Sequence, residues 1–182
     1  LLKPSPRTQM PKLMEAIRSL KIVKIAGSTQ LEHKGEIIPI EDGLLKKNGR
    51  QKKPYDAFYY RNISIIENGI ADFDFMKVHR QLSEECIYDN GTSWGGSAPN
   101  DLSYCVSLIS RVSNLANTPE LNQIFGFQQE KTENDLTDVI NAFISEENTT
   151  DNLLRLNLEN VKYDFQVRET LVNAIGKFLL TK

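Results

Sequence analysis

The helical character of this chain is clearest over residues 101–116, which read DLSYCVSLISRVSNLA. Apolar side chains recur there at spacings of three, four and seven residues, which place them on one face of an α-helix. The face consists of Leu102, Cys105, Leu108, Ile109, Val112 and Leu115. The pattern predicts a helix that begins at Asn100 or Asp101 and buries this face.

The same periodicity predicts further helices on both sides of this stretch. The first covers residues 8–20, with Thr8 as N-cap, Pro11 in the first turn and a buried face of Met10, Leu13, Met14, Ile17 and Leu20. Residues 21–26 fit either a strand or a continuation of this helix. Thr118 and Pro119 form a helix start signal for a short helix that ends at Phe125. The remaining predicted helices cover residues 72–88, 133–145 and 164–182.

Strands are expected to be few and short. Residues 36–40 fit an edge strand, because Pro39 lacks a backbone donor. Alternating apolar residues predict strands at 63–65 and 154–158, with a turn at 67–69. Residues 89–99 are dense in turn formers and predict a loop. We therefore expect an α+β fold that is predominantly helical, with about six helices and a few short strands.

We expect residues 1–182 to form a single helix-rich domain or an insertion fragment. Residues 1–26 hold a helix and a strand, residues 27–100 are poorly patterned and loop-rich, and residues 101–182 are helical with one strand.

Composition indicates an ordinary globular protein. Hydrophobic residues make up 40% of the chain and charged residues 25%, and 22 Lys and Arg against 24 Asp and Glu give a formal net charge of -2. This balance excludes a protein that is basic all over, although a local patch can still bind nucleic acid. No apolar run approaches the roughly 20 residues that span a bilayer, so we expect no membrane contact. Two cysteines make no disulfide framework in a chain of this length, and we expect free thiols and a cytoplasmic location. Cys86 and Cys105 fall in apolar helical patterns and are predicted to be buried free thiols.

The sequence contains no recognisable nucleotide-binding, metal-binding or catalytic motif. No segment fits a nucleotide-binding P-loop: Gly176-Lys177 lies in a helical pattern, and the glycine-rich residues 91–96 lack the lysine. His33 and His79 have no further ligand at a metal-site spacing, and His79 is expected to be a satisfied, half-buried histidine. The acidic pairs Glu84-Glu85 and Glu146-Glu147 point about 100° apart on a helix and are expected to be solvated. We therefore predict no catalytic, cofactor-binding or metal-binding residue.

A cationic run is the one feature with the character of a nucleic-acid contact. It is followed closely by four aromatic residues, which could stack on unpaired bases while the cations neutralise phosphates. The other interpretation is an exposed, mobile loop that happens to be cationic, since Asp42 and Asp56 flank it. Both remain open. The basic residues of the run are Lys46, Lys47, Arg50, Lys52 and Lys53.

The second half of the chain contains several segments whose order along the chain matches that in a known protein family. Residues 110–126, SRVSNLANTPELNQIFG, resemble a stretch of the HerA-like ATPases of the HerA-FtsK superfamily. An acidic amphipathic helix, a strand, a segment reading NVKYDFQVR and a further helix are similar to the pieces that follow in that family. The opening LKPSPRTQMPKL is similar to another family segment. These matching segments are residues 2–13, 134–143, 153–158, 160–168 and 169–180, so that the resemblance covers about 1–25 and 105–182.

The resemblance implies that this chain is a mostly helical insertion in a RecA-like ATPase core. HerA-like proteins place their Walker A and Walker B motifs before and after the matching region, so no catalytic residue is carried over. The start at Leu1 is interpreted as a boundary inside a larger protein. The parent would bind ATP and Mg²⁺, form a hexameric ring that moves along double-stranded DNA, and work with a nuclease or an anti-phage defence effector.

Three hypotheses about function follow. The first is an accessory, non-catalytic region of a HerA-like DNA translocase, serving subunit, partner or DNA contacts. The second is an independent helical protein–protein interaction module without a nucleotide or DNA role. The third is an enzyme of unrecognised type that uses the loop from Gly91 to Pro99.

Overall fold

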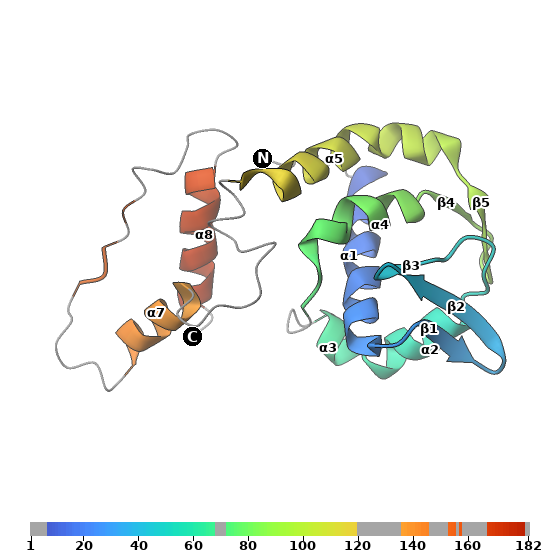
Figure 1. The fold of residues 1–182 in the computed structure, drawn as a ribbon, viewed down its shortest axis with the longest axis horizontal. Coiled ribbons are helices and arrows are strands. Elements are labelled where there is room, and N and C mark those ends of the chain that lie inside the picture. Colours follow the sequence, from blue (N-terminus) through green and yellow to red (C-terminus); the bar gives the residue numbers. More distant parts are fainter. Residues whose placement is uncertain are drawn as a thin grey trace. The chain divides into compact units, whose positions relative to one another are not determined.

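The computed structural model describes residues 7–67, 72–119, 136–145, 153–155, 157 and 167–180. It divides the chain into two compact units, an N-terminal unit of Leu2–Asn117 and a C-terminal unit of Thr118–Lys182. Within the described residues there are seven α-helices and two small antiparallel sheets (Figure 1). This confirms the predicted α+β class with a predominantly helical character.

Three helices build one half of the N-terminal unit. Helix α1 (Gln9–Ala26) packs on α4 (Val78–Glu84), and α4 packs on α5 (Pro99–Asn117). Helix α1 includes residues 21–26, which therefore continue the helix and do not form a strand; Gly27 ends it in the left-handed conformation at φ 57°. The side chains buried together here come from the three helices and, in the case of Leu44, from a short strand; they are Ala16, Leu20, Leu44, Val78, Leu82, Leu108 and Val112.

The predicted burial of the helices is right for α5 and partly wrong for α1. Helix α5 buries Cys105, Leu108 and Val112, and Cys86 and Cys105 are buried free thiols as expected. On α1, Met10 and Met14 are exposed, because α4 and β3 cover the adjacent face that contains Ala16 and Ser19.

A three-stranded sheet lies beside the helices. Strands β1 (Gln30–His33), β2 (Glu36–Glu41) and β3 (Leu44–Leu45) are antiparallel in the order β1-β2-β3. Strand β2 was predicted, but it is the middle strand and not an edge strand. Pro39 is tolerated there because it lacks only a donor, and its carbonyl accepts a hydrogen bond from the Lys46 N–H at 2.9 Å.

Residues 27–100 hold more regular structure than their pattern indicated. Helices α2 (Lys53–Arg61) and α3 (Ile63–Glu67), the 3₁₀ turn η1 (Phe75–Lys77), and the paired strands β4 (Ile87–Asp89) and β5 (Trp94–Ser97) lie there. The second buried cluster joins α1, both sheets, α2 and α3 through Ile22, Leu31, Ile38, Leu45, Tyr55, Ile66, Ile87 and Trp94.

Of three predicted elements in this region, the strand and the loop are wrong, and the helix is right over residues 75–84 only. The strand at 63–65 is the helix α3, in which Ile66 is buried and the alternating Ile63 and Ile65 are exposed. The helix at 72–88 ends at Glu84, and the residues after Cys86 enter β4. The loop at 89–99 contains β5, which forms because its backbone pairs with β4 despite its two glycines. Of the predicted turn at 67–69, residues 68 and 69 lie outside the described residues.

The C-terminal unit contains α7 (Leu136–Ile144) and α8 (Val167–Leu180), which confirm the helices predicted at 133–145 and 164–182. Gly176-Lys177 lies inside α8, as expected. Leu153–Arg155 and Asn157 are not in a strand, and the rest of the strand predicted at 154–158 lies outside the described residues. So do most of the short helix predicted at 118–125 and the pair Glu146-Glu147. None of the described helices is long and apolar enough to cross a membrane.

Candidate functional site

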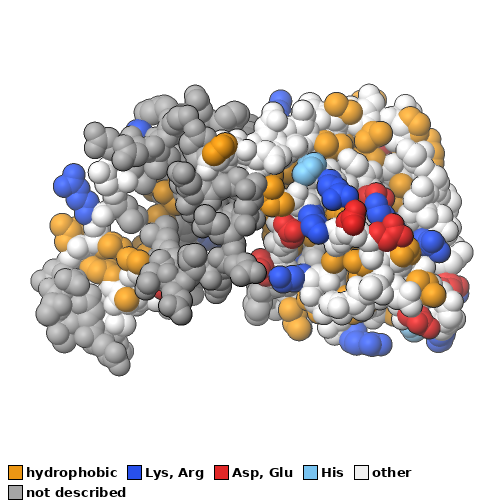
Figure 2. All heavy atoms as spheres, in the orientation of Figure 1, with side chains coloured by type: hydrophobic (Ala, Val, Ile, Leu, Met, Phe, Trp, Pro, Cys, Tyr) orange, Lys and Arg blue, Asp and Glu red, His pale blue; other side chains and the backbone are white. Residues whose placement is uncertain are grey.

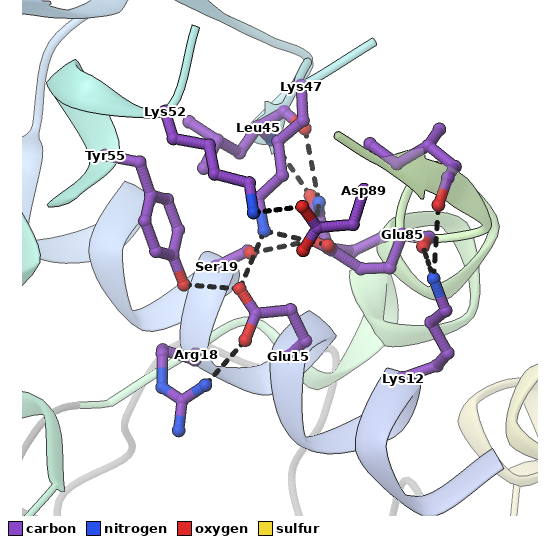
Figure 3. Close-up of polar contacts among 12 residues, drawn as sticks. Lys12, Glu15, Arg18, Ser19, Leu45, Lys47, Lys52, Tyr55, Glu85 and Asp89 are labelled. Atoms are coloured by element: carbon purple, nitrogen blue, oxygen red, sulfur yellow. Dashed lines mark hydrogen bonds and ion pairs between the residues drawn. The ribbon is translucent and has the colours of Figure 1, made fainter. Parts of the chain in front are cut away.

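The most unusual feature of the N-terminal unit is a lysine in its interior. The Lys47 side chain has no exposed surface, and its ammonium Nζ bonds to Glu85 Oε2 at 2.7 Å and to Glu15 Oε1 at 3.0 Å (Figure 3). A buried charge without partners would cost several kcal/mol. Here two carboxylates surround it, and we call Glu15, Ser19, Lys47, Tyr55, Gln81 and Glu85 the Lys47 cluster.

Four elements bring the cluster together. Glu15 and Ser19 lie one turn apart on α1, and Gln81 and Glu85 lie one turn apart at the end of α4, so each pair shares a helix face. Lys47 follows β3, and Tyr55 lies in the first turn of α2. The cluster therefore cross-links the helical half of the unit to the half that contains the sheets.

Glu85 is held by groups other than Lys47 as well. Its Oε1 accepts hydrogen bonds from Ser19 Oγ at 2.7 Å and from Gln81 Nε2 at 2.8 Å. The Gln81 amide also accepts a bond from the Leu45 N–H at 2.9 Å, which ties α4 to β3. Both carboxylate oxygens of Glu85 thus have partners, as buried polar groups require.

Glu15 is equally well supported. Its Oε1 accepts a bond from the Tyr55 hydroxyl at 2.6 Å, and its Oε2 from Arg18 Nη1 at 2.5 Å. Burial acts to raise the pKa of Glu15, but the Lys47 charge, the Tyr55 hydroxyl and Arg18 together lower it to about 2. Burial and the neighbouring Glu15 carboxylate raise the pKa of Tyr55 above its usual value. Glu15 is therefore ionised and Tyr55 protonated at neutral pH.

Two aromatic rings complete the surroundings of the Lys47 ammonium. Its Nζ lies 4.4 Å from the ring centroid of Tyr55 and 5.0 Å from that of Trp94. The two rings meet edge to face, with centroids 5.5 Å apart. Ring faces attract cations at this range, most strongly when water is excluded. The ammonium is thus enclosed by two carboxylates and two aromatic rings.

The structure disperses the five basic residues that were predicted to contact nucleic acid. Lys47 is buried, so its ammonium cannot reach a phosphate outside the protein. Lys46 pairs with Glu84, and Arg50 is exposed. Lys52 pairs with Asp89 and Lys53 with Glu36. Figure 2 shows basic and acidic side chains side by side on one face of the N-terminal unit. A nucleic-acid contact through the four residues other than Lys47 stays a prediction.

The expectation that Glu84 and Glu85 are both solvated is wrong for Glu85, which is 3% exposed. The two side chains do point apart, and this is why Glu84 reaches Lys46 near the surface while Glu85 turns into the core. Glu15, Ser19 and Gln81 are further members of the cluster that were not expected from the sequence. Their signal is the four-residue spacing of polar residues beside an apolar helix face, at 15/19 and 81/85.

The other titratable groups singled out in the sequence are a histidine and the cysteines. His79 is half-buried, with a pKa lowered by burial and by the Arg80 charge, and its Nδ1 lacks the hydrogen-bond partner that was expected for it. Burial raises the pKa of the Cys86 thiol to about 12, which keeps it protonated. In the part of the chain that the structure describes, no three His, Cys, Asp or Glu residues are grouped so that they could hold a metal ion.

Comparison with known proteins gives no relative: neither a protein-family model, nor a curated protein, nor a solved structure matches this chain. The resemblance to HerA-like ATPases therefore remains a prediction from the sequence.

The ionisation of Glu15 leads to a first testable prediction, on pH dependence. Because the folded-state pKa is about 2 and the usual value 4.5, the ionised carboxylate stabilises the fold above about pH 4.5. This stability is lost as the pH falls from about 4.5 towards 2. We expect Glu15 to account for about 1–3 kcal/mol, since its side chain is partly exposed. The measurement is the free energy of unfolding across this range, in the wild type and in Glu15→Gln.

The variant isolates the contribution of this group from that of the other carboxylates. The difference in unfolding free energy between the two proteins should shrink as the pH falls. A difference that stays constant from neutral pH to about pH 2 would contradict the assignment.

Proposed function

We propose that this chain is an accessory, non-catalytic region of a HerA-like, ATP-driven double-stranded DNA translocase, and that it serves protein contacts within that assembly. The observation that carries the proposal is an apolar stripe on α8. Val172 and Leu179 are 55% and 45% exposed, and Ile175 is partly exposed between them. Their spacing of three and four residues places them on one helix face.

Exposed apolar residues that line up on a helix face are typical of surfaces that contact another protein. The stripe lies within residues 169–180, the segment that resembles the family helix after NVKYDFQVR. A contact of this helix with a neighbouring subunit or a partner would bury the stripe. This supports a protein contact as the role of the C-terminal unit.

The pairing of four lysines in the cationic run favours a protein contact over a DNA contact through that run. Lys46, Lys52 and Lys53 pair with carboxylates, and Lys47 is buried. A phosphate would have to compete with these carboxylates for each paired lysine, which weakens the electrostatic gain of DNA binding. ATP, Mg²⁺, DNA and a nuclease or defence effector then belong to the proposed parent assembly, which would be a homo-oligomeric ring.

The second candidate function is an independent helical protein–protein interaction module. The same stripe on α8 favours it, and it needs neither nucleotide nor DNA. The two functions differ in what accompanies this chain in its gene. A P-loop before Leu1 and a hydrophobic strand ending in Asp-Glu after Lys182 support the translocase, and the lack of both supports the module.

The experiment substitutes the stripe in the protein that contains this chain. We expect Val172→Glu combined with Leu179→Glu to weaken assembly and DNA-stimulated ATP hydrolysis about tenfold or more, because central apolar contacts dominate interface energies. Mass photometry and an ATPase assay give the readouts. Both residues are exposed, so the helix content by circular dichroism should not change.

The control places two glutamates elsewhere on the helix and changes the net charge by -3, against -2 for the stripe variant, so an effect of charge alone would be at least as large in the control. Asn173→Glu combined with Lys177→Glu changes two exposed residues of α8 outside the stripe and should leave assembly and hydrolysis near wild-type levels. Equal effects of the two double variants, or no effect of the first, would count against a contact through the stripe.

A further inference from the structure

We propose that Glu15, Glu85, Tyr55 and Trp94 form a binding site for a primary alkylammonium group, which the chain fills with its own Lys47. The inference goes beyond the proposed function and does not depend on it. It assigns the site a ligand class: a short, unbranched alkyl chain that ends in an ammonium group.

The surroundings of Lys47 Nζ have the chemistry that recognises such a group. Two carboxylate oxygens, at 2.7 Å and 3.0 Å, accept charge-assisted hydrogen bonds. Two ring faces, at 4.4 Å and 5.0 Å, provide cation–π attraction. A neutral chain of the same shape would satisfy none of these groups, so the site selects for positive charge.

The walls of the site are held in place without help from Lys47. Glu85 stays bonded to Ser19 and Gln81, and Glu15 stays bonded to Tyr55 and Arg18. The Tyr55 and Trp94 rings support each other edge to face. These contacts keep the carboxylates and rings in position when the Lys47 side chain is shortened.

The backbone that delivers Lys47 is also fixed independently. The Lys46 N–H bonds to the Pro39 carbonyl at 2.9 Å, and the Trp94 N–H bonds to the Arg50 carbonyl at 2.9 Å. Shortening Lys47 to alanine therefore leaves the loop in place and opens a space with the shape of the missing atoms. Those atoms are the last three carbons and the nitrogen of the side chain, which together are a propylammonium ion.

The experiment is chemical rescue of Lys47→Ala by n-propylammonium chloride. We expect the ion to raise the unfolding temperature of the variant in a saturable way, with half-saturation at about 1–10 mM, the range open to a ligand of so few atoms. The wild type, whose site is filled, should show no such rise. Trp94 is the only tryptophan of the chain and lies in the site, so its fluorescence reports binding directly.

Three controls test the ligand class. Propan-1-ol has the same size without the charge, and sodium chloride supplies the ionic strength; neither should stabilise Lys47→Ala. Lys47→Met fills the space with a neutral chain and should not respond to propylammonium.

Each outcome decides the proposal. Stabilisation of the wild type and the variant to the same extent would overturn it, as would equal rescue by propan-1-ol. If Lys47→Ala does not fold alone, recovery of its tryptophan emission and near-ultraviolet circular dichroism on refolding in propylammonium supports the site. Failure to recover them at any concentration tested would refute it.

Discussion

Glu85→Ala is expected to destabilise the N-terminal unit by about 3–5 kcal/mol, because it removes one partner of a buried ion pair. Lys47 would keep a single carboxylate, at 3.0 Å, inside a site that excludes water. Ser19 would lose the acceptor of its hydroxyl, and Gln81 would lose one of its two acceptors and keep the Leu45 carbonyl at 3.2 Å. The measurement is urea unfolding followed by the fluorescence of Trp94.

The neighbouring residue provides the control for this prediction. Glu84 is paired with Lys46 near the surface, with 27% of its side chain exposed. Glu84→Ala should cost at most about 1 kcal/mol, the usual range for a surface ion pair. If the two variants lose the same stability, Glu85 contributes no more to the free energy of unfolding than a residue in a surface ion pair.

The second large effect is expected for Leu82→Ala, which should lower the free energy of unfolding by about 2–5 kcal/mol. Leu82 has no exposed surface and packs in the cluster shared by α1, α4 and α5. Removing its branched end loses the transfer free energy of the buried carbons and leaves a cavity. The midpoint of urea unfolding should fall while the dependence on urea concentration stays the same.

Val106 on α5 serves as the comparison, since it is apolar and 56% exposed. Val106→Ala should change the unfolding free energy by less than about 0.5 kcal/mol. A loss for Leu82→Ala as small as that for Val106→Ala would mean that this cluster is not a core of the unit.

The sequence predicted the elements whose signal lies within a single helix. Residues 101–116 carry their apolar side chains at helical spacing, so α5 could be located almost to the residue. Strand β5 could not, because Trp94-Gly-Gly-Ser97 looks like a turn by itself and is extended through its pairing with β4 and its backbone bonds to Gly49 and Arg50. Ile63 and Ile65 show the reverse case, where an alternating pattern is overridden by the packing of Ile66.

The Lys47 cluster could not be predicted from the sequence, because the partners of Lys47 are far from it along the chain. Lys46 and Lys47 look alike in the sequence, yet one lies near the surface and the other has no exposed surface. What separates them is the position of Glu15 and Glu85, which are 32 and 38 residues away along the chain. No local pattern contains that information. The cationic run could be recognised as cationic, but not divided into buried and accessible charges.

The buried charges also limit how this protein can change over time. Replacing Lys47 alone would leave Glu15 and Glu85 without the cation that they share, whereas replacing either carboxylate alone leaves one ion pair with Lys47. A purely apolar replacement of the three would need simultaneous changes on α1, on α4 and in the loop after β3. An intermediate that loses Lys47 while both carboxylates remain holds two acidic groups in the interior without their shared cation, and we expect it to be less stable than either end point. We therefore expect Lys47 to be retained as long as both carboxylates are present.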